Sequence, residues 1–131
     1  MANGRCPFCS VPTSASSHQN DFALALPDVF PVSKGHTLVV PRRHVASLFD
    51  LPAPEQDAVW RLVSHVRTDL QHDLTPDGFT VGINDGAAAG QTVMHAHVHV
   101  IPRRRGDVPD PRGGIRWVCP DKAPYWLEGG R

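Results

Sequence analysis

Three histidines, His95, His97 and His99, stand at alternate positions of the segment Gln91-Thr-Val-Met-His-Ala-His-Val-His-Val-Ile-Pro102, with apolar residues between them. Imidazole is a good nucleophile, titrates near neutral pH and is a common zinc ligand. The segment could therefore serve a metal site, or nucleophilic or acid–base catalysis. An exposed strand face that carries three histidines by chance is the least favoured of these interpretations.

A second group of metal-ligand residues begins near the N-terminus. Cys6 and Cys9 form a CxxC pair, and His44 lies just beyond a predicted strand. Two cysteines with two histidines make a closed, tetrahedral structural zinc site. His95 is nearest the start of the histidine segment and would complete the set, so the sequence predicts structural Zn²⁺ bound by Cys6, Cys9, His44 and His95. The alternative is that the two cysteines contribute only buried apolar sulfur.

Zinc bound by the three alternating histidines themselves is disfavoured by geometry. Residues i and i+4 of a strand lie about 13 Å apart at roughly 3.3 Å per residue, so one ion does not comfortably reach all three rings. With His95 predicted to complete the cysteine site, His97 and His99 are left for other chemistry.

Nucleophilic attack on phosphorus fits the remaining two histidines. The reaction needs one free ring nitrogen, an acceptor for the other ring N–H, and hydrogen-bond donors for the phosphoryl oxygens. The loop at residues 84–90 is rich in glycine and alanine, which lets backbone N–H groups approach a phosphate closely. Asn84, Gln91 and Thr92 lie in or beside this loop and could supply further donors.

The elements that position these residues are short strands and one helix. Strands are predicted at residues 21–26 and 35–40, as an antiparallel pair, at 78–83 and through the histidine segment, with one more short strand at 115–118. Apolar residues recur at three- and four-residue steps over 54–74, which predicts an amphipathic helix. His65 and His72 lie off its apolar stripe and are interpreted as ordinary surface residues. Residues 11–19 are predicted to be a loop with a helical turn.

Composition limits the classes of function. The 131 residues suffice for one domain, and 13 basic against 13 acidic residues give no overall field that would favour nucleic acid or membrane. The chain has no apolar run of about 18 residues, and residues 1–6 lack an apolar signal core, so we expect a cytoplasmic protein. Cys119 has no partner in the pattern and is predicted to be a packed thiol. The run Arg103-Arg-Arg105 is either solvated surface or a lip for a polyanionic substrate.

Taken together, the motifs resemble a known family. His95-Ala-His97-Val-His99-Val-Ile101 is similar to the signature of the histidine triad (HIT) superfamily of nucleotide hydrolases and transferases. The resemblance extends from Cys6 to about Asp107, through Cys6-Pro-Phe-Cys9, Gly35-His-Thr-Leu-Val-Val-Pro41, Asn84-Asp-Gly86 and Gly90-Gln-Thr-Val93. It implies a single α+β domain over residues 1–131 with an irregular tail from about 103, usually as a homodimer. The implied fold is a central antiparallel sheet of about five strands with one long helix and a short N-terminal helix or turn.

The same resemblance implies roles for individual residues. His97 would attack the α-phosphate of a nucleotide and form a covalent nucleotidyl-histidine, which water hydrolyses. His99 would contact the phosphate, the His95 carbonyl would orient the His97 ring, and His36 would support the site. Substrate would be bound through Asp28 at the ribose, through Asn84, Gln91 and Thr92 at the phosphate or leaving group, and through Phe8, Leu26, Val29 and Leu38 at the base. Metal-bearing relatives bind zinc through the residues that match Cys6, Cys9, His44 and His95.

Features of two branches of the superfamily are combined. The segment from Gly90 to the Ile-Pro-Arg sequence resembles the fragile-histidine-triad branch, which cleaves dinucleoside polyphosphates. The CxxC pair and His44 resemble the nucleotide-binding branch, which includes phosphoramidases. The resemblance therefore implies a hydrolase for a purine nucleotide or dinucleotide. A nucleotide-binding or signalling module with negligible turnover, and an enzyme that uses zinc as a Lewis acid, remain as alternatives.

Overall fold

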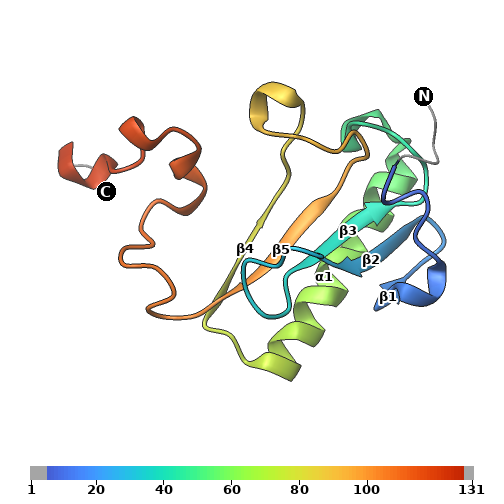
Figure 1. The fold of residues 1–131 in the computed structure, drawn as a ribbon, viewed down its shortest axis with the longest axis horizontal. Helices are drawn as coiled ribbons and strands as arrows, with labels where there is room; N and C mark the ends of the chain where they lie inside the picture. Colours follow the sequence, from blue (N-terminus) through green and yellow to red (C-terminus); the bar gives the residue numbers. More distant parts are fainter. Residues whose placement is uncertain (1–5, 129–131) are drawn as a thin grey trace.

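The computed structural model describes residues 6–128, which form a five-stranded antiparallel sheet with a long helix packed on one face (Figure 1). The strand order is β1-β2-β3-β5-β4, with strands at His18–Gln19 (β1), Ala23–Pro27 (β2), Thr37–Pro41 (β3), Gly78–Gly82 (β4) and Val98–Arg103 (β5). The predicted α+β class is confirmed. Residues 1–5, where we expected no signal segment, lie outside the described residues. Within the described range, no helix combines the length and the apolar character needed to span a membrane.

Helix α1 spans Ala53–Leu74, as the apolar spacing predicts. It begins after Pro52. Pro54 in the first turn costs no intrahelical hydrogen bond, because the first N–H groups of a helix have no partner within it. It ends at Thr75, whose φ of 45° is left-handed and stops the helical path. The buried face packs against β2, β3 and β5 and carries Val59, Leu62, Val63 and Val66.

The sheet has two apolar faces of different kinds. Strands β2 and β3 pair antiparallel, as expected, and their alternate residues point to opposite sides. One side joins the core beneath α1. The other side forms a second apolar cluster, Leu24, Leu26, Leu38 and Val40, against which Phe8 and Val11 pack. His99 is directly opposite Leu38 in the β3–β5 register, so its ring lies on this second face, away from α1.

The prediction that all three histidines belong to one strand is wrong, because β5 begins only at Val98. His95 and His97 precede the strand. Their segment is held instead by a hydrogen bond from the Ala96 N–H to the Val45 carbonyl at 2.7 Å, outside the sheet ladder. The apolar–polar alternation nevertheless persists, since Ala96, Val98 and Val100 are all buried in the core.

The turn before β3 lies against the end of α1. Gly35 adopts a φ of +92°, a conformation that side chains strongly disfavour. A Cβ atom here would lie 2.6 Å from Leu74 Cδ1 and 3.2 Å from both Leu70 Cδ2 and Pro102 Cγ. The backbone of the turn that leads into His36 therefore packs directly against side chains of α1 and β5.

The prediction of a short strand at 115–118 is also wrong, because these residues lie in a 3-10 helix, η5 (Gly114–Val118). Strand β1 takes the place of this predicted strand in the five-stranded sheet. It lies within residues 11–19, which were predicted as a loop, and its two residues are too few to show a period of two. The tail after β5 extends beyond the β4 edge of the sheet (Figure 1). Cys119 in this tail is exposed, not packed. The remaining 3-10 helices are η2 (Thr13–Ala15), η3 (Leu48–Asp50), η4 (Ala87–Ala89), η6 (Pro120–Lys122) and η7 (Tyr125–Glu128).

Candidate active site and metal centre

Four metal-ligand side chains meet where the N-terminal segment passes the end of β3. The Nδ1 atoms of His44 and His95 are 3.1 Å apart, and Cys9 Sγ lies 3.1 Å from the first and 3.6 Å from the second. Cys6 Sγ is 3.5 Å from His95 Nδ1, and all four donor atoms lie within 4.8 Å of one another. Neighbouring donors around a tetrahedral zinc ion with bonds of about 2.0–2.3 Å are about 3.3–3.8 Å apart, so this set fits zinc.

The protonation of the cluster also suits a cation. His95 is 1% exposed, and its Nε2–H donates to the Pro41 carbonyl at 2.8 Å, which leaves the Nδ1 lone pair directed at the cluster. Burial lowers the pKa of His95 and so favours its neutral, ligating form. Desolvation and the neighbouring Cys6 thiol raise the pKa of Cys9, because two adjacent thiolates repel each other unless a cation lies between them.

The ring of His97 is oriented by the backbone of His95. His97 Nδ1 lies 2.8 Å from the His95 carbonyl oxygen, and an N–H donated there leaves the lone pair of Nε2 available. The ring packs edge-on against Phe8 and His99, with centroid distances of 5.2 Å to each. His95 therefore contributes its imidazole to the metal cluster and its carbonyl to His97.

A chain of hydrogen bonds determines the tautomers of His36 and His99. The Val32 N–H donates to His36 Nδ1 at 3.1 Å, so the proton of His36 is on Nε2. That Nε2–H donates to His99 Nδ1 at 2.9 Å, which places the His99 proton on Nε2 as a hydrogen-bond donor. Burial lowers the pKa of both imidazoles, although Asp28, whose carboxylate lies 3.3 Å from His36 Nε2, opposes this shift. Both rings are thus held neutral.

A cavity of about 790 Å³ lies on the sheet face away from α1. It brings together eleven of the predicted site residues: Phe8, Leu26, Asp28, Val29, His36, Leu38, Asn84, Gln91, Thr92, His97 and His99. Its apolar wall includes Leu26 and Leu38 of the second apolar cluster, and its polar residues include His97 and His99. His95 is the one predicted catalytic residue outside this lining, because its ring is buried among the ligand side chains Cys6, Cys9 and His44.

The side chain of Gln91 organises the loop before the histidines. Its Oε1 accepts from the Gly86 N–H at 2.8 Å, and its Nε2 donates to the carbonyls of Ala46 and Val93 at 2.8 and 3.0 Å. Gln91 is 5% exposed, so these bonds are shielded from water. The structure thus places its carboxamide among loop backbone groups, while Asn84 and Thr92 flank the cavity.

Sequence reasoning missed several further lining residues, Phe30 and Val32 among them. They are 85% and 72% exposed and continue the cavity wall past Asp28, whose Oδ1 accepts from the Phe30 N–H at 2.8 Å. The available signal was an apolar run, Val29-Phe-Pro-Val32, in a segment that cannot be a strand because of its proline.

The arginine run lies away from this cavity. The Arg103 guanidinium pairs with Asp107 at 2.6 Å and holds the pKa of that carboxyl at about 2. Arg104 donates to the carbonyls of Leu74 and Thr75 at the end of α1, at 2.5 and 3.3 Å. These two side chains therefore stabilise the fold at the helix end, and neither lines the cavity.

Comparison with known proteins places these features in a wider group. A family model described as the HIT domain matches residues 13–106. An uncharacterized 16.1 kDa HIT-like protein of Mycoplasma pneumoniae is 38% identical over 107 residues, which are 79% of this chain and 74% of that protein. An adenylylsulfatase of Arabidopsis thaliana is 32% identical over 106 residues, 78% and 54% of the two chains. A bis(5′-adenosyl)-triphosphatase of Dictyostelium discoideum is 38% identical over 87 residues, 66% and 58% of the two chains.

Solved structures are similar over most of the chain. A member of the HIT family from Bacillus subtilis superposes with a TM-score of 0.72 and 30% identity, covering 79% of this chain and 76% of the other. A zinc-bound histidine triad family protein from Mycobacterium smegmatis gives the same TM-score and identity, covering 99% and 100% of the two chains.

Proposed function

This chain belongs to the histidine triad (HIT) family, and from that premise we propose that it is a hydrolase that cleaves nucleotide substrates at the α-phosphate. The proposed substrates are dinucleoside polyphosphates or nucleoside phosphoramidates of purines. One observation carries the proposal. The His97 ring lines the cavity, and its Nδ1–H is held by the His95 carbonyl, so that Nε2 keeps its lone pair.

In the proposed reaction, His97 Nε2 attacks the α-phosphorus. The N–P bond forms as the bond from phosphorus to the leaving oxygen or nitrogen breaks, and the leaving group takes a proton from solvent. Water then attacks the phosphorus, the N–P bond breaks, and the proton of that water passes to solvent. The His95 carbonyl stabilises the positive charge that the ring carries while the N–P bond exists.

The phosphate oxygens would be met by neutral donors. The tautomer set by His36 gives His99 an Nε2–H that can donate to a phosphoryl oxygen. Gly86 and Gly90 adopt φ values of +97° and +94°, which shape the loop beside this end of the cavity, and the N–H groups of Gly86 and Gly90 are bonded within the loop itself. We assign Gln91 to positioning this loop, and Asn84 and Thr92 to direct contact with the phosphate or the leaving group.

The apolar wall of the cavity would accept the base. Leu26 and Leu38 supply a buried apolar surface, Phe8 packs on it partly buried, and Val29 is largely exposed. Asp28 lines the same cavity, with its carboxylate 3.3 Å from His36 Nε2, and can accept hydrogen bonds from ribose hydroxyls. Apolar walls with a few placed polar groups are typical of small-molecule sites.

Zinc would be held by Cys6, Cys9, His44 and His95. The donor set is complete without a substrate or water ligand, so the ion would supply structure and not Lewis-acid chemistry. By ordering His95 it would support the carbonyl that orients His97. The zinc-bound relative from Mycobacterium smegmatis supports this assignment.

The reaction is tested with the His97→Ala variant and a substrate panel. The panel contains diadenosine triphosphate, diadenosine tetraphosphate, adenosine phosphoramidate and adenylyl sulfate, with identification of the products. We expect the native protein to release adenosine monophosphate from at least one of them and His97→Ala to release none. His72→Ala, an exposed histidine outside the cavity, is the control. Undiminished turnover by His97→Ala would refute the mechanism.

Trapping of the intermediate separates turnover from binding alone. Rapid acid-free quenching of the native protein with labelled substrate should yield a nucleotidyl adduct on His97. Stoichiometric nucleotide binding with neither adduct nor product would favour the alternative of a nucleotide-binding module with negligible turnover.

We also propose that the single domain acts as a homodimer. Strand β4 is at one edge of the described sheet, and exposed apolar side chains lie on it and on the adjacent tail: Val81, Ile115, Val118 and Leu127. An unpaired edge with apolar neighbours is the kind of surface that a second copy covers.

A further inference from the structure

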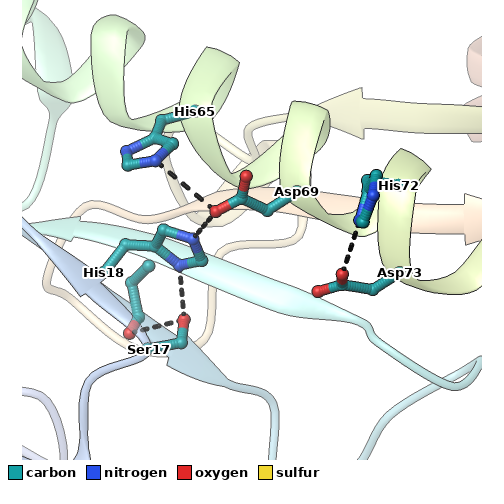
Figure 2. Close-up of polar contacts among 7 residues, drawn as sticks. Ser17, His18, His65, Asp69, His72 and Asp73 are labelled. Carbon is teal, nitrogen blue, oxygen red and sulfur yellow. Dashed lines mark hydrogen bonds and ion pairs between the residues drawn. The ribbon is translucent and has the colours of Figure 1, made fainter.

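A second cluster of imidazole and carboxylate groups lies at the opposite side of the sheet from β4. His18 of β1 faces His65 and Asp69 of α1, as Figure 2 shows. His18 Nε2 is 2.6 Å from Asp69 Oδ2, and His65 Nε2 is 3.4 Å from the same oxygen. The two imidazole centroids are 4.8 Å apart, and all three donor atoms lie within 4.8 Å of one another. Neither the triad nor the cysteine cluster uses these residues.

We propose that His18, His65 and Asp69 bind a divalent transition-metal ion, at a site independent of the cysteine cluster and of the nucleotide cavity. The site has two imidazole ligands and one carboxylate ligand. An ion there would link the two-residue edge strand β1 to the middle of α1.

The spacing of the three residues suits one ion. His65 and Asp69 are four residues apart and share one face of α1, the helical spacing at which two ligands reach a common metal. Donors bound at about 2.0–2.2 Å lie about 3.0–3.6 Å apart. The separation of 3.4 Å already falls in this range, and the separation of 2.6 Å must open by less than an ångström.

The His18 ring is held in the orientation that a ligand needs. Its Nδ1 lies 2.9 Å from Ser17 Oγ, which in turn lies 3.5 Å from the Ala25 carbonyl oxygen. If Nδ1–H donates to the serine and the serine donates to the carbonyl, the proton-bearing nitrogen is fixed and Nε2 is the ligand atom. Metal ligands in proteins commonly depend on such a second hydrogen bond. A metal ion bound between His18 Nε2 and Asp69 Oδ2 would then replace the proton that these two atoms share in their close contact.

Charge and access also favour a cation. The side chains of His18, Asp69 and His65 are 18%, 45% and 61% exposed, so an ion could enter from solvent and keep water ligands. The hydrogen bond from His18 lowers the pKa of Asp69, which keeps the carboxylate charged at neutral pH.

The donor types select the class of metal. Imidazole suits Zn²⁺, Ni²⁺, Co²⁺ and Cu²⁺, whereas Mg²⁺ and Ca²⁺ prefer oxygen ligands. The rival explanation is a surface ion pair in which protonated His18 simply meets Asp69. His72 provides a matched comparison, because it lies on the same helix and pairs with Asp73 at 3.1 Å but is not part of the cluster (Figure 2).

The test is a calorimetric titration of the protein, first saturated with Zn²⁺ at its cysteine cluster and freed of excess metal, with Ni²⁺ as the probe. We expect one Ni²⁺ per chain. His65→Ala should weaken its binding by at least about tenfold, since losing even a supporting partner of a ligand costs 10–100-fold. Asp69→Asn should weaken it similarly, and His72→Ala should leave it within about twofold.

His65 is mostly exposed, so its replacement leaves the core intact, and circular dichroism of each variant checks the fold. Ni²⁺ should also raise the melting temperature of the native protein and of His72→Ala, but not of His65→Ala. No Ni²⁺ binding beyond the cysteine cluster would overturn the proposal. So would equal losses in His65→Ala and His72→Ala.

Discussion

At the scale of single residues, His36 and His99 share one hydrogen bond, and burial lowers the pKa of both. A histidine whose folded-state pKa lies below its unfolded value of about 6.5 binds more protons when unfolded. Its contribution to stability is complete above about pH 6.5 and declines as the pH falls from there toward the folded-state pKa. Both histidines should therefore make the protein less stable in mild acid.

This pH dependence is measurable by urea unfolding at about pH 7.5 and about pH 5.5. We expect the native protein to lose more free energy of unfolding between these pH values than His99→Asn loses. Each unit of pKa difference corresponds to about 1.4 kcal/mol. Release of zinc in acid affects both proteins and cancels in the comparison. His72→Ala, with an 89% exposed side chain, should keep the native pH dependence, and an identical slope in His99→Asn would contradict the assignment.

The residue types of the candidate site were accessible from the sequence, but their protonation was not. The alternation of histidines and the resemblance named eleven residues that the structure brings to one cavity. The tautomers of His36 and His99 depend on the Val32 N–H, a backbone group four residues away in a turn. No pattern of side chains encodes that bond. His18 was missed for a related reason, because its two partners are some fifty residues distant on α1.

At the scale of elements, the loop between β4 and the histidines depends on Gln91. Removing its side chain leaves the Gly86 N–H and the carbonyls of Ala46 and Val93 without these partners. Gln91→Ala should lower the free energy of unfolding by about 1–3 kcal/mol, the cost of a buried polar group left unsatisfied. It should also raise KM for the nucleotide, because Asn84 and Thr92, which flank the loop and line the cavity, lose their placement.

Urea unfolding and steady-state kinetics on Gln91→Ala and Gln91→Glu check this. The glutamate can still accept from Gly86, but its charged carboxylate would face the two carbonyl oxygens with no donor, so it should be at least as destabilised as the alanine variant. A large kinetic loss at unchanged stability in both variants would mean that Gln91 acts on the substrate directly.

The N-terminal segment at Cys6 and Cys9 is a second element, held by the packing of Phe8 and, in our proposal, by zinc. A bound ion stabilises the folded state by about 2.7 kcal/mol when its free concentration is about 100 times Kd. Chelation, or Cys9→Ser, should therefore lower the melting temperature by several degrees, roughly 5 °C or more. Turnover by the protein that remains folded should persist below that temperature. Immediate loss of turnover at an unchanged melting temperature would instead favour zinc as a Lewis acid.

Secondary structure followed from the sequence where the pattern was long. Helix α1 has 22 residues, and its apolar spacing identified both of its ends closely. Strand β1 has two residues and no period to detect. The start of β5 was misplaced because alternation continues through His95 and His97, although the Val45 carbonyl holds Ala96 outside the sheet. Tertiary hydrogen bonds, not local preference, decided this boundary.

At the scale of the whole molecule, the exposed β4 edge leads to the proposal of a homodimer, which can be tested by measuring the mass in solution. Light scattering coupled to size exclusion should give twice the monomer mass. Val81→Lys, which places a charge on the edge strand, and Val118→Glu on the adjacent tail should shift the protein toward monomer. Phe22→Glu is the matched control, since Phe22 is 42% exposed beside β2, at the far side of the sheet. A native monomer, or equal dissociation by the control, would contradict this interface.

The turn at Gly35 has a consequence for how this sequence tolerates change. Any side chain there must adopt an unfavourable φ and displace Leu74, yet the next residue carries the imidazole that sets the His99 proton. In a library that samples every substitution across the described residues, position 35 should accept almost none, even when selection is for abundance alone. Position 90, also a glycine of positive φ but in the left-handed region, with a ψ of 7° and open space around its Cβ, should accept asparagine. The contrast would map, without any assay of chemistry, where the helix end and the cavity depend on the same backbone.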